Sequence, residues 1–422
     1  MTPSTSSASS SFSSFSSLSA RVLAAGAVLA VALPLAGPAS ADEGTSGDWP
    51  AHTDGVTVFD KGEDGFECFR IPAIVRAPDG SLLAFAEARR GSESAGYCYD
   101  DGSIDLVMRR STDGGWSWSH SQTILAGDPW GRDVGATRGN PVPIVLTQGE
   151  HAGRIVLLST WNVEGSRAER RPFVQYSDDS GRTWSEAADL TDSVKPGFPE
   201  QGWYATGPQH GIELTHGPHR GRLVAGVNYL NTAQSDRSQG GLIHSDDGGV
   251  TWQAGASAPM PADADHFSEV AVAETADGGL YAIGRSRKGP KSVETREFSR
   301  AVARSTDGGE TFEEKTFAYQ SDLLTTPEVQ GSVLSAVQPG RPATDTLVYA
   351  APQHGTLRKN LGVFVSTDAG DSWARTDTLT LNRSGYSDMV MLDADSVGVL
   401  YETGLESGDA RDRIVFQASD LR

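Results

Sequence analysis

An eight-residue pattern, S-x-D-x-G-x-[S/T]-aromatic, occurs five times and constrains the fold of this chain more than any other feature. The copies begin at residues 111, 177, 245, 305 and 366, so successive copies lie 60 to 68 residues apart. Recurrence at such a period is typical of repeated supersecondary units. The Asp accepts hydrogen bonds from backbone N–H groups just downstream, Gly supplies the positive φ of a tight turn, and the aromatic residue returns as a buried anchor. Each copy therefore predicts a hairpin between two antiparallel strands.

A second set of strand-like segments accompanies these five boxes. Six short runs rich in strand-forming residues occur at 81–87, 154–160, 222–228, 279–285, 346–350 and 396–402. A last run at 413–418 has no box, and we expect the early strand at 56–59 to join it. Six similar antiparallel sheets predict an all-β fold, a six-bladed β-propeller with five Asp boxes. A β-sandwich or jelly roll is the alternative, although neither requires six similar units.

The first 41 residues are excluded from this fold. A Ser-rich start is followed by Arg21, an apolar run at 22–35 and the small residues Ala39-Ser40-Ala41. This order is typical of a secretory signal peptide with its cleavage site, and the run is too short for a transmembrane helix. We therefore expect residues 42–422 to form one secreted domain without membrane insertion. The net charge of −20 argues against nucleic acid or an anionic membrane as a partner.

The two cysteines and the absence of several standard motifs limit which kinds of site the chain can contain. Export leads to an oxidising compartment, where Cys68 and Cys98 can form a disulfide, although two free buried thiols are the alternative. The chain lacks a G-x-S-x-G elbow, an H-E-x-x-H motif, a phosphate-binding loop and a paired Cys motif. The Asp boxes also lack the full ligand run of a calcium loop. We therefore expect neither a metal nor a cofactor.

The segment Phe69-Arg70-Ile71-Pro72, taken together with the boxes, resembles the bacterial sialidases, or neuraminidases. The resemblance covers essentially the whole mature chain and implies a six-bladed propeller. That family holds the substrate carboxylate with three arginines, and the resemblance implies Arg70, Arg285 and Arg358 at those positions. Three forked guanidiniums around one carboxylate form charge-assisted hydrogen bonds and a local positive region in an acidic protein.

The resemblance also implies the residues that react. Tyr386 matches the nucleophile, Glu269 the base beside it, and Asp100 the general acid/base, with Asp101 as the alternative because the preceding loop is long. A neutral phenol suits an anomeric carbon that carries a carboxylate. An attacking carboxylate would meet a repulsion of roughly 4 kcal/mol at 4 Å if the effective dielectric constant is near 20. A phenol is a poor nucleophile at neutral pH and therefore needs an adjacent base.

Four further positions are candidates for binding or support. By resemblance, Arg89 lies near the carboxylate and glycerol side of the sugar, and Glu402 pairs with and orients Arg70. Asn140 and Trp203, or Phe198 in place of Trp203, are candidates for the N-acetyl and O4 side. A disulfide between Cys68 and Cys98 would fix the loop of Asp100 to the strand of Arg70, since each cysteine lies two residues before the site residue.

The function implied is that of a secreted, retaining exo-α-sialidase, a glycoside hydrolase that removes terminal sialic acids from glycoconjugates. Sialylated glycans are the expected partners. The alternatives are a transferring or intramolecular trans-sialidase, which shares these residues, and a sialic-acid-binding propeller without catalysis.

Overall fold

The computed structural model describes most of the chain after residue 54. The described ranges are 55–90, 98–128, 135–163, 165–198, 201–231, 237–257, 264–288, 297–313, 318–323, 326–355, 357–405 and 410–422. The predicted signal peptide, residues 1–41, lies outside them. Within these ranges the fold is all-β, as predicted. The helices there are a four-residue α1 (Thr191–Val194) and the 3₁₀ turns at Glu63–Gly65, Arg167–Glu169, Lys195–Gly197 and Ser321–Leu323. Each is too short to cross a lipid bilayer.

The turn chemistry of the repeated pattern is visible in its hydrogen bonds. In the third copy, Asp247 accepts from the backbone N–H of Thr251 at 2.9 Å and from the Thr251 hydroxyl at 2.5 Å. Gly249 has φ +88°, and a Cβ there would lie 2.5 Å from the side chain of Val156. The Trp252 indole N–H closes the turn by donating to the Gly249 carbonyl at 3.0 Å. The equivalent carboxylates of the other copies accept in the same way from the residue four positions on, and they are Asp113, Asp179, Asp307 and Asp368.

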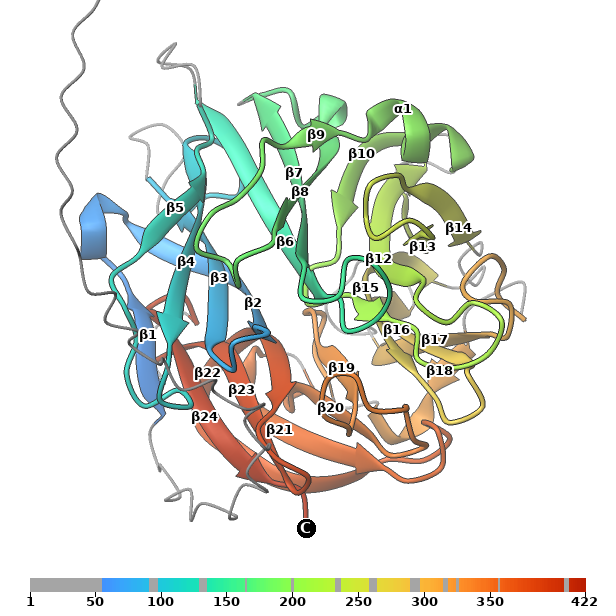
Figure 1. Cartoon of the computed structure of the whole chain (residues 1–422). Helices are drawn as coiled ribbons and strands as arrows, with labels where there is room; N and C mark the ends of the chain where they lie inside the picture. The colour runs from blue at the N-terminus through green and yellow to red at the C-terminus, as the bar shows by residue number, and fades with distance from the viewer. Residues whose placement is uncertain are drawn as a thin grey trace, which may run out of the picture. The chain divides into compact units, whose positions relative to one another are not determined.

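Each of the five turns joins two antiparallel strands, as predicted. The described strands belong to four sheets (Figure 1). The first sheet contains β2 (Cys68–Arg76), β3 (Leu82–Arg89), β4 (Ile104–Ser111), β5 (Gln122–Leu125), β6 (Ala136–Val145), β7 (Ile155–Val163), β8 (Arg171–Ser177) and β9 (Ala188–Asp189). The second contains β10 (Gln201–Thr206), β11 (Ile212–Glu213), β12 (Leu223–Asn231), β13 (Arg237–Ser245) and β14 (Gln253–Ser257).

The other two sheets come from the second half of the chain. One contains β15 (Ala264–Glu274), β16 (Leu280–Lys288), β17 (Glu297–Ser305) and β18 (Ala318–Gln320). The other contains β19 (Ser332–Ser335), β20 (Leu347–Pro352), β21 (Lys359–Ser366), β22 (Ala374–Met391), β23 (Ser396–Gly404), β24 (Arg413–Asp420) and β1 (Val56–Asp60). The early strand β1 pairs with β24 in antiparallel register, as expected.

Two of the sheets are longer than one hairpin unit. The 18-residue strand β22 pairs with β21 through its first part and with β23 through its second part. In the first sheet, β4 and β6 run parallel and share the single register pair Ile104 and Thr137. Each long sheet therefore contains two antiparallel runs of strands. In the first sheet the two runs are joined by the short β4–β6 pairing, and in the last sheet they share the long strand β22.

The inner strands of these runs lie beside one another in sequence order. Strand β2 packs against β6 and β22, β6 against β10, β12 against β15, β15 against β19, and β19 against β22. Figure 1 follows this order from the blue strands through green and yellow to the orange and red ones. Buried apolar side chains fill the space between consecutive runs. One such cluster contains Phe85 and Leu157, and another contains Val270 and Leu242. The inner strands thus converge from all four sheets, and the candidate site is built on them.

Candidate active site

A cavity of about 550 Å³ lies where the inner strands meet. It is lined by seven of the residues predicted from the sequence, namely Arg89, Asp100, Asn140, Trp203, Glu269, Arg285 and Tyr386. Arg70 and Arg358 adjoin it, because their guanidinium carbons lie 5.2 and 5.9 Å from the centre of the Tyr386 ring. Residues that are far apart in the sequence therefore meet at one place.

Irregularities in the pairing of the inner strands direct these side chains towards the cavity. The pairing register shifts at residues 70–73 of β2, 139–142 of β6, 268–271 of β15 and 384–387 of β22. Ile71, Asn140 and Glu269 lie within three of these shifts and have φ values of 56°, 53° and 51°. A bulge adds a residue to one strand and redirects its side chains, and such bulges are frequent beside functional sites. The same local device therefore presents Asn140, Glu269 and Tyr386 to the cavity.

Tyr386 and Glu269 form a hydrogen-bonded pair in this cavity. The Tyr386 hydroxyl donates to Glu269 Oε1 at 2.5 Å, and Arg285 Nη1 donates to the same hydroxyl at 3.1 Å. Arg285 also contacts both carboxylate oxygens of Glu269, at 3.2 and 3.1 Å. Burial and the charge of Glu269 raise the pKa of Tyr386, whereas the nearby arginines lower it. The geometry allows the phenol proton to move directly to Glu269 as the oxygen attacks an electrophile.

Glu402 holds the strands of Arg70 and Tyr386 together. Its Oε1 accepts from Arg70 Nε at 2.6 Å and from the Ile71 amide at 2.9 Å, while its Oε2 accepts from the Tyr386 amide at 3.1 Å. Burial disfavours the charge on Arg70, but Glu402 outweighs this effect, so the pKa of Arg70 is raised. A Cβ at Gly385 would lie 2.3 Å from Glu402 Oε2, which leaves room only for glycine. Glu402 is thus paired with Arg70, and an orienting role for it remains a prediction.

Arg358 completes a crowded group of guanidiniums. Its Nη2 donates to the backbone carbonyl of Glu328 at 3.4 Å. Burial lowers the pKa of Arg358, and the charges of Arg285 and Arg70 lower it further, although Tyr386 and Glu402 act in the opposite direction. Arg70 and Arg285 each have a carboxylate partner, so the repulsion within this group acts mainly on Arg358. A bound carboxylate would relieve that repulsion and accept charge-assisted hydrogen bonds.

The structure distinguishes the two aspartates that the sequence left open. Asp100 is 58% exposed, lines the cavity and accepts from Arg89 Nη1 at 2.5 Å. Asp101 is only 7% exposed, and its carboxylate accepts from Asn162 Nδ2 at 2.8 Å and from the Gly165 amide at 3.0 Å. Asp101 therefore supports the neighbouring loop, and Asp100 is the carboxylate that a ligand in the cavity can contact.

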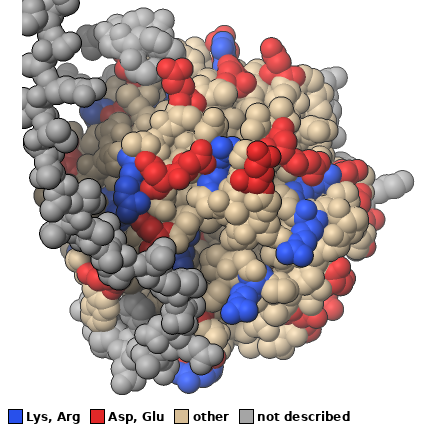
Figure 2. All heavy atoms as spheres, viewed as in Figure 1, with Lys and Arg blue, Asp and Glu red and all other residues tan. Residues whose placement is uncertain are grey.

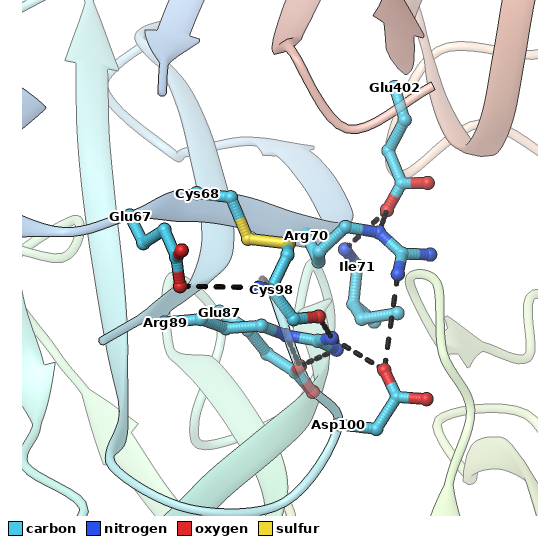
Figure 3. Close-up of a disulfide and its surroundings, with 9 residues drawn as sticks. All are labelled: Glu67, Cys68, Arg70, Ile71, Glu87, Arg89, Cys98, Asp100 and Glu402. Carbon is cyan, nitrogen blue, oxygen red and sulfur yellow. Dashed lines mark hydrogen bonds and ion pairs between the residues drawn. A yellow bond between two sulfur atoms is a disulfide. The ribbon is translucent and has the colours of Figure 1, made fainter. Parts of the chain in front are cut away.

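The disulfide between Cys68 and Cys98 is formed, so the pairing predicted from the sequence is confirmed (Figure 3). Cys98 lies two residues before Asp100, and its carbonyl accepts a hydrogen bond from Arg89 Nη1 at 3.0 Å. The close-up shows Asp100 between the guanidiniums of Arg89 and Arg70, and the Arg70 ion pair spans 3.9 Å. The cross-link thus joins β2 to the segment that carries Asp100. The preceding residues 91–97 lie outside the described ranges.

Asn140, Trp203 and Phe198 were the candidates for further contacts with a ligand, beside the arginine group of Arg70, Arg285 and Arg358. Asn140 and Trp203 line the cavity, and the Arg170 guanidinium lies 5.6 Å from the centre of the Trp203 ring. Arg170 Nη1 also donates to Asn140 Oδ1 at 3.2 Å. Phe198, the alternative to Trp203, is instead packed in the core against Tyr229, with ring centres 5.0 Å apart. The structure therefore excludes Phe198 from the cavity.

Glu87, Arg170 and Asn228 are among the cavity residues that the sequence analysis did not identify. Glu87 accepts from Arg89 Nη2 at 2.5 Å and from the Asn140 amide at 2.9 Å, and the Asn228 side chain accepts from the Glu269 amide at 3.2 Å. Glu87 was accessible to reasoning, because residues two apart on a strand share a face with Arg89. No local pattern marks Arg170 or Asn228, which reach the cavity only through the packing of one sheet beside another.

One face of the molecule is mixed in charge, because acidic and basic side chains are interspersed on it (Figure 2). Among the described residues, no three His, Cys, Asp or Glu side chains come together to hold a metal ion.

Comparison with known proteins finds a matching family model and similar proteins. Residues 72–399 match the model of the BNR repeat-like domain. The sialidase of Micromonospora viridifaciens is 29% identical over 403 residues, which cover 90% of this chain and 57% of that protein. The sialidase of Bacteroides fragilis is 27% identical over 394 residues, covering 88% of this chain and 65% of that protein. The chain thus spans about three fifths of the length of these two curated relatives.

Solved structures share the fold. A Hadza microbial sialidase superposes with a TM-score of 0.69 at 26% identity, covering 87% of this chain and 68% of that one. The intramolecular trans-sialidase of Ruminococcus gnavus, solved in complex with oseltamivir carboxylate, gives a TM-score of 0.66 at 19% identity and covers 87% and 97% of the two chains.

Proposed function

Because the chain belongs to the sialidase family that carries a BNR repeat-like domain, we propose that it is a retaining exo-α-sialidase that releases terminal sialic acids from glycoconjugates. The observation that carries this proposal is the Tyr386 and Glu269 pair, 2.5 Å apart, beside Arg70, Arg285 and Arg358. A phenol with a carboxylate base is an unusual nucleophile, and it suits a sugar whose reacting carbon already bears a negative group.

The arginine group supports sialic acid as the substrate. The substrate carboxylate would occupy the space between Arg70, Arg285 and Arg358, where like charges now repel. Guanidiniums are suited to this role because each presents a planar fork of donors that matches a carboxylate. This contact would place the anomeric carbon, which is bonded to that carboxylate, against the Tyr386 hydroxyl.

The reaction proceeds in two displacements. Tyr386 loses its proton to Glu269 and attacks the anomeric carbon, while Asp100 gives a proton to the departing glycosidic oxygen. Water then attacks the same carbon, Asp100 takes its proton, and the tyrosine oxygen leaves with the proton held by Glu269. Two inversions give net retention. The exposure of Asp100 supports its role, because the leaving aglycone and the incoming water both pass through the solvent side of the cavity.

We also propose that the strands form the six blades of a propeller. The blades would be β2–β5, β6–β9, β10 with β12–β14, β15–β18, β19 to the first part of β22, and the second part of β22 with β23, β24 and β1. The contacts of consecutive inner strands and the apolar clusters between consecutive runs support this arrangement. The predicted signal peptide at residues 1–41 supports secretion as a further part of the proposal.

The second candidate function is intramolecular or transferring trans-sialidase activity. The solved trans-sialidase of Ruminococcus gnavus, which shares the fold, favours its consideration. The two activities share the glycosyl-tyrosine step and differ in whether water or a sugar hydroxyl takes the sialic acid. Product analysis by mass spectrometry, with and without added galactoside, separates free sialic acid from a transferred or anhydro product.

The decisive experiment measures hydrolysis of a natural sialoside by wild-type protein and by Tyr386→Phe. We expect the variant to lose at least 10³-fold in kcat, because the covalent route needs the phenol oxygen. Ground-state binding of free sialic acid should remain within a few-fold, since phenylalanine keeps the ring contacts. Arg109→Lys, outside the cavity, serves as a handling control. Hydrolysis by Tyr386→Phe at the wild-type rate would remove Tyr386 from the mechanism.

A further inference from the structure

Another arginine, the buried Arg300 on β17, lies on the strand next to that of Arg285 and has no role in the mechanism above. It is the register partner of Arg285 on β16 and is 1% exposed. Its guanidinium donates only to neutral oxygens in the described structure. The acceptors are Thr326 Oγ1 at 3.1 Å, the Pro327 carbonyl at 3.5 Å and the Val329 carbonyl. All three belong to the segment of residues 326–330, which enters β19.

The charge on Arg300 is costly where it lies. Burial lowers the pKa of Arg300, and the charges of Arg285 and Arg358 add to this effect, although Tyr349 and Glu269 partly oppose it. Taking a cation out of water without a paired carboxylate destabilises a folded protein. Arg300 therefore contributes its hydrogen bonds to residues 326–330 and a contact with Tyr349, whose ring centre lies 5.8 Å from the guanidinium carbon. The other contacts of residues 326–330 indicate what these hydrogen bonds position.

Residues 326–330 contact the part of the candidate active site around Arg285, Arg358 and Tyr386. The Glu328 carbonyl accepts from Arg358 Nη2 at 3.4 Å, and the Glu328 carboxylate lies 3.6 Å from Arg285 Nη2. Val329 packs in one apolar cluster with Tyr386 and Ile71. The Gln330 side chain accepts from the amide of Ser387 at 3.0 Å and donates to its carbonyl at 2.9 Å, next to the nucleophile. One short segment thus contacts two of the three arginines, the phenol ring and the strand of the phenol.

We propose that Arg300 is a positioning residue for the carboxylate site. Its hydrogen bonds hold residues 326–330 in place. That segment in turn fixes Arg285, Arg358 and Tyr386 in the arrangement that receives the substrate. The planar fork of arginine suits this task because it reaches three acceptors at once, whereas the single ammonium of lysine is a point donor on a flexible stem. The inference rests on the proposed function, since the ligand that reports it is sialic acid.

The test compares Arg300→Lys with Arg138→Lys as a matched control. Arg138 is also buried on an inner strand, where it packs 4.7 Å from the ring centre of Phe173, and it does not line the cavity. We expect Arg300→Lys to raise KM for a fluorogenic sialoside at least 10-fold with a smaller fall in kcat. It should also reduce the preference for sialic acid over its methyl ester in competitive inhibition at least 5-fold. Arg138→Lys should leave both quantities within 2-fold of wild type.

The acid-to-ester preference separates positioning from a general loss of folding, because a smaller folded fraction lowers kcat and changes neither KM nor the preference. Wild-type KM and preference in folded Arg300→Lys would overturn the inference while leaving the proposed function intact.

A second variant covers the case in which Arg300→Lys does not fold. Thr326→Val removes one acceptor of Arg300 and keeps the shape of the side chain, so we expect a 2- to 5-fold rise in KM in the same assay. An unchanged KM in Thr326→Val would then refute the positioning role. Wild-type protein that neither hydrolyses sialosides nor binds sialic acid would refute the proposed function, and the inference with it.

Discussion

Removal of the disulfide between Cys68 and Cys98 should lower both stability and turnover, through two separate physical effects. The cross-link closes a loop with a sequence separation of 30 residues. In the chain-entropy model, a loop of that length restricts the unfolded state enough to stabilise the protein by about 3–4 kcal/mol. The functional effect is local, because Asp100 lies two residues after Cys98, whose carbonyl accepts from Arg89. Without the cross-link, the carboxylate of Asp100, the proposed acid/base, would occupy its position for a smaller fraction of the time.

The assay uses the double variant Cys68→Ala/Cys98→Ala and wild-type protein reduced with dithiothreitol, which keeps both sulfur atoms. Urea unfolding should give a free energy of unfolding lower by about 3–4 kcal/mol in both preparations. Turnover of a natural sialoside should fall more than turnover of an aryl sialoside, because an aryl leaving group needs less protonation by Asp100. Equal losses on both substrates would refute the link to Asp100. Unchanged stability in both preparations would refute the entropic argument.

Two further predictions concern charge. Arg358→Met should raise KM for sialosides at least 10-fold and leave thermal stability equal or higher, because burial and the neighbouring arginines disfavour the Arg358 charge in the free protein; a lower Tm with unchanged KM would contradict this. In the last Asp box, hydrogen bonds from Ser372 and Ser366 lower the pKa of Asp368 to about 2 from 3.8, so its contribution to stability is complete above the unfolded value and is lost as the pH falls towards 2. Asp368→Asn should therefore lower Tm by roughly 2 °C at pH 6 and by less at pH 2, and a constant difference across that range would contradict the assignment.

The sequence predicted the regular part of the fold well, because the repeated turns carry their own chemistry. Asp at the third position and Gly at the fifth determine a tight turn wherever they occur with a following Ser or Thr, so the five hairpins could be located without a structure. The pairing of 56–59 with the C-terminal run was also accessible, since an unpaired last strand needs a partner. The extent of β22 was not, because its first part is polar and alternates weakly.

Only those residues of the candidate site that belong to a motif or match the family resemblance could be predicted from the sequence. The motifs and the resemblance supplied the arginines, Tyr386, Glu269 and the choice between two aspartates. Exposure and cavity lining favour Asp100, because it is the one of the two that a ligand in the cavity can contact. The positive φ values at Asn140 and Glu269 could not be foreseen, because neither residue type requires them and the bulges depend on packing across sheets. The sequence did not indicate a role for Arg300 for a related reason, since two of its three acceptors are backbone carbonyls, which no sequence pattern displays.

In the proposed mechanism Glu269 is needed in addition to the arginines, and the charges at the site explain why. In the free protein, Arg285, Arg358 and Arg70 lower the pKa of Tyr386 and partly offset the effects of burial and of Glu269. The substrate carboxylate that these arginines bind would cancel part of that positive charge at the moment of reaction. Substrate binding therefore makes the phenol harder to ionise, and the arginines alone cannot activate it. A base in direct contact, such as Glu269 at 2.5 Å, avoids this conflict because it accepts the proton as the new bond forms.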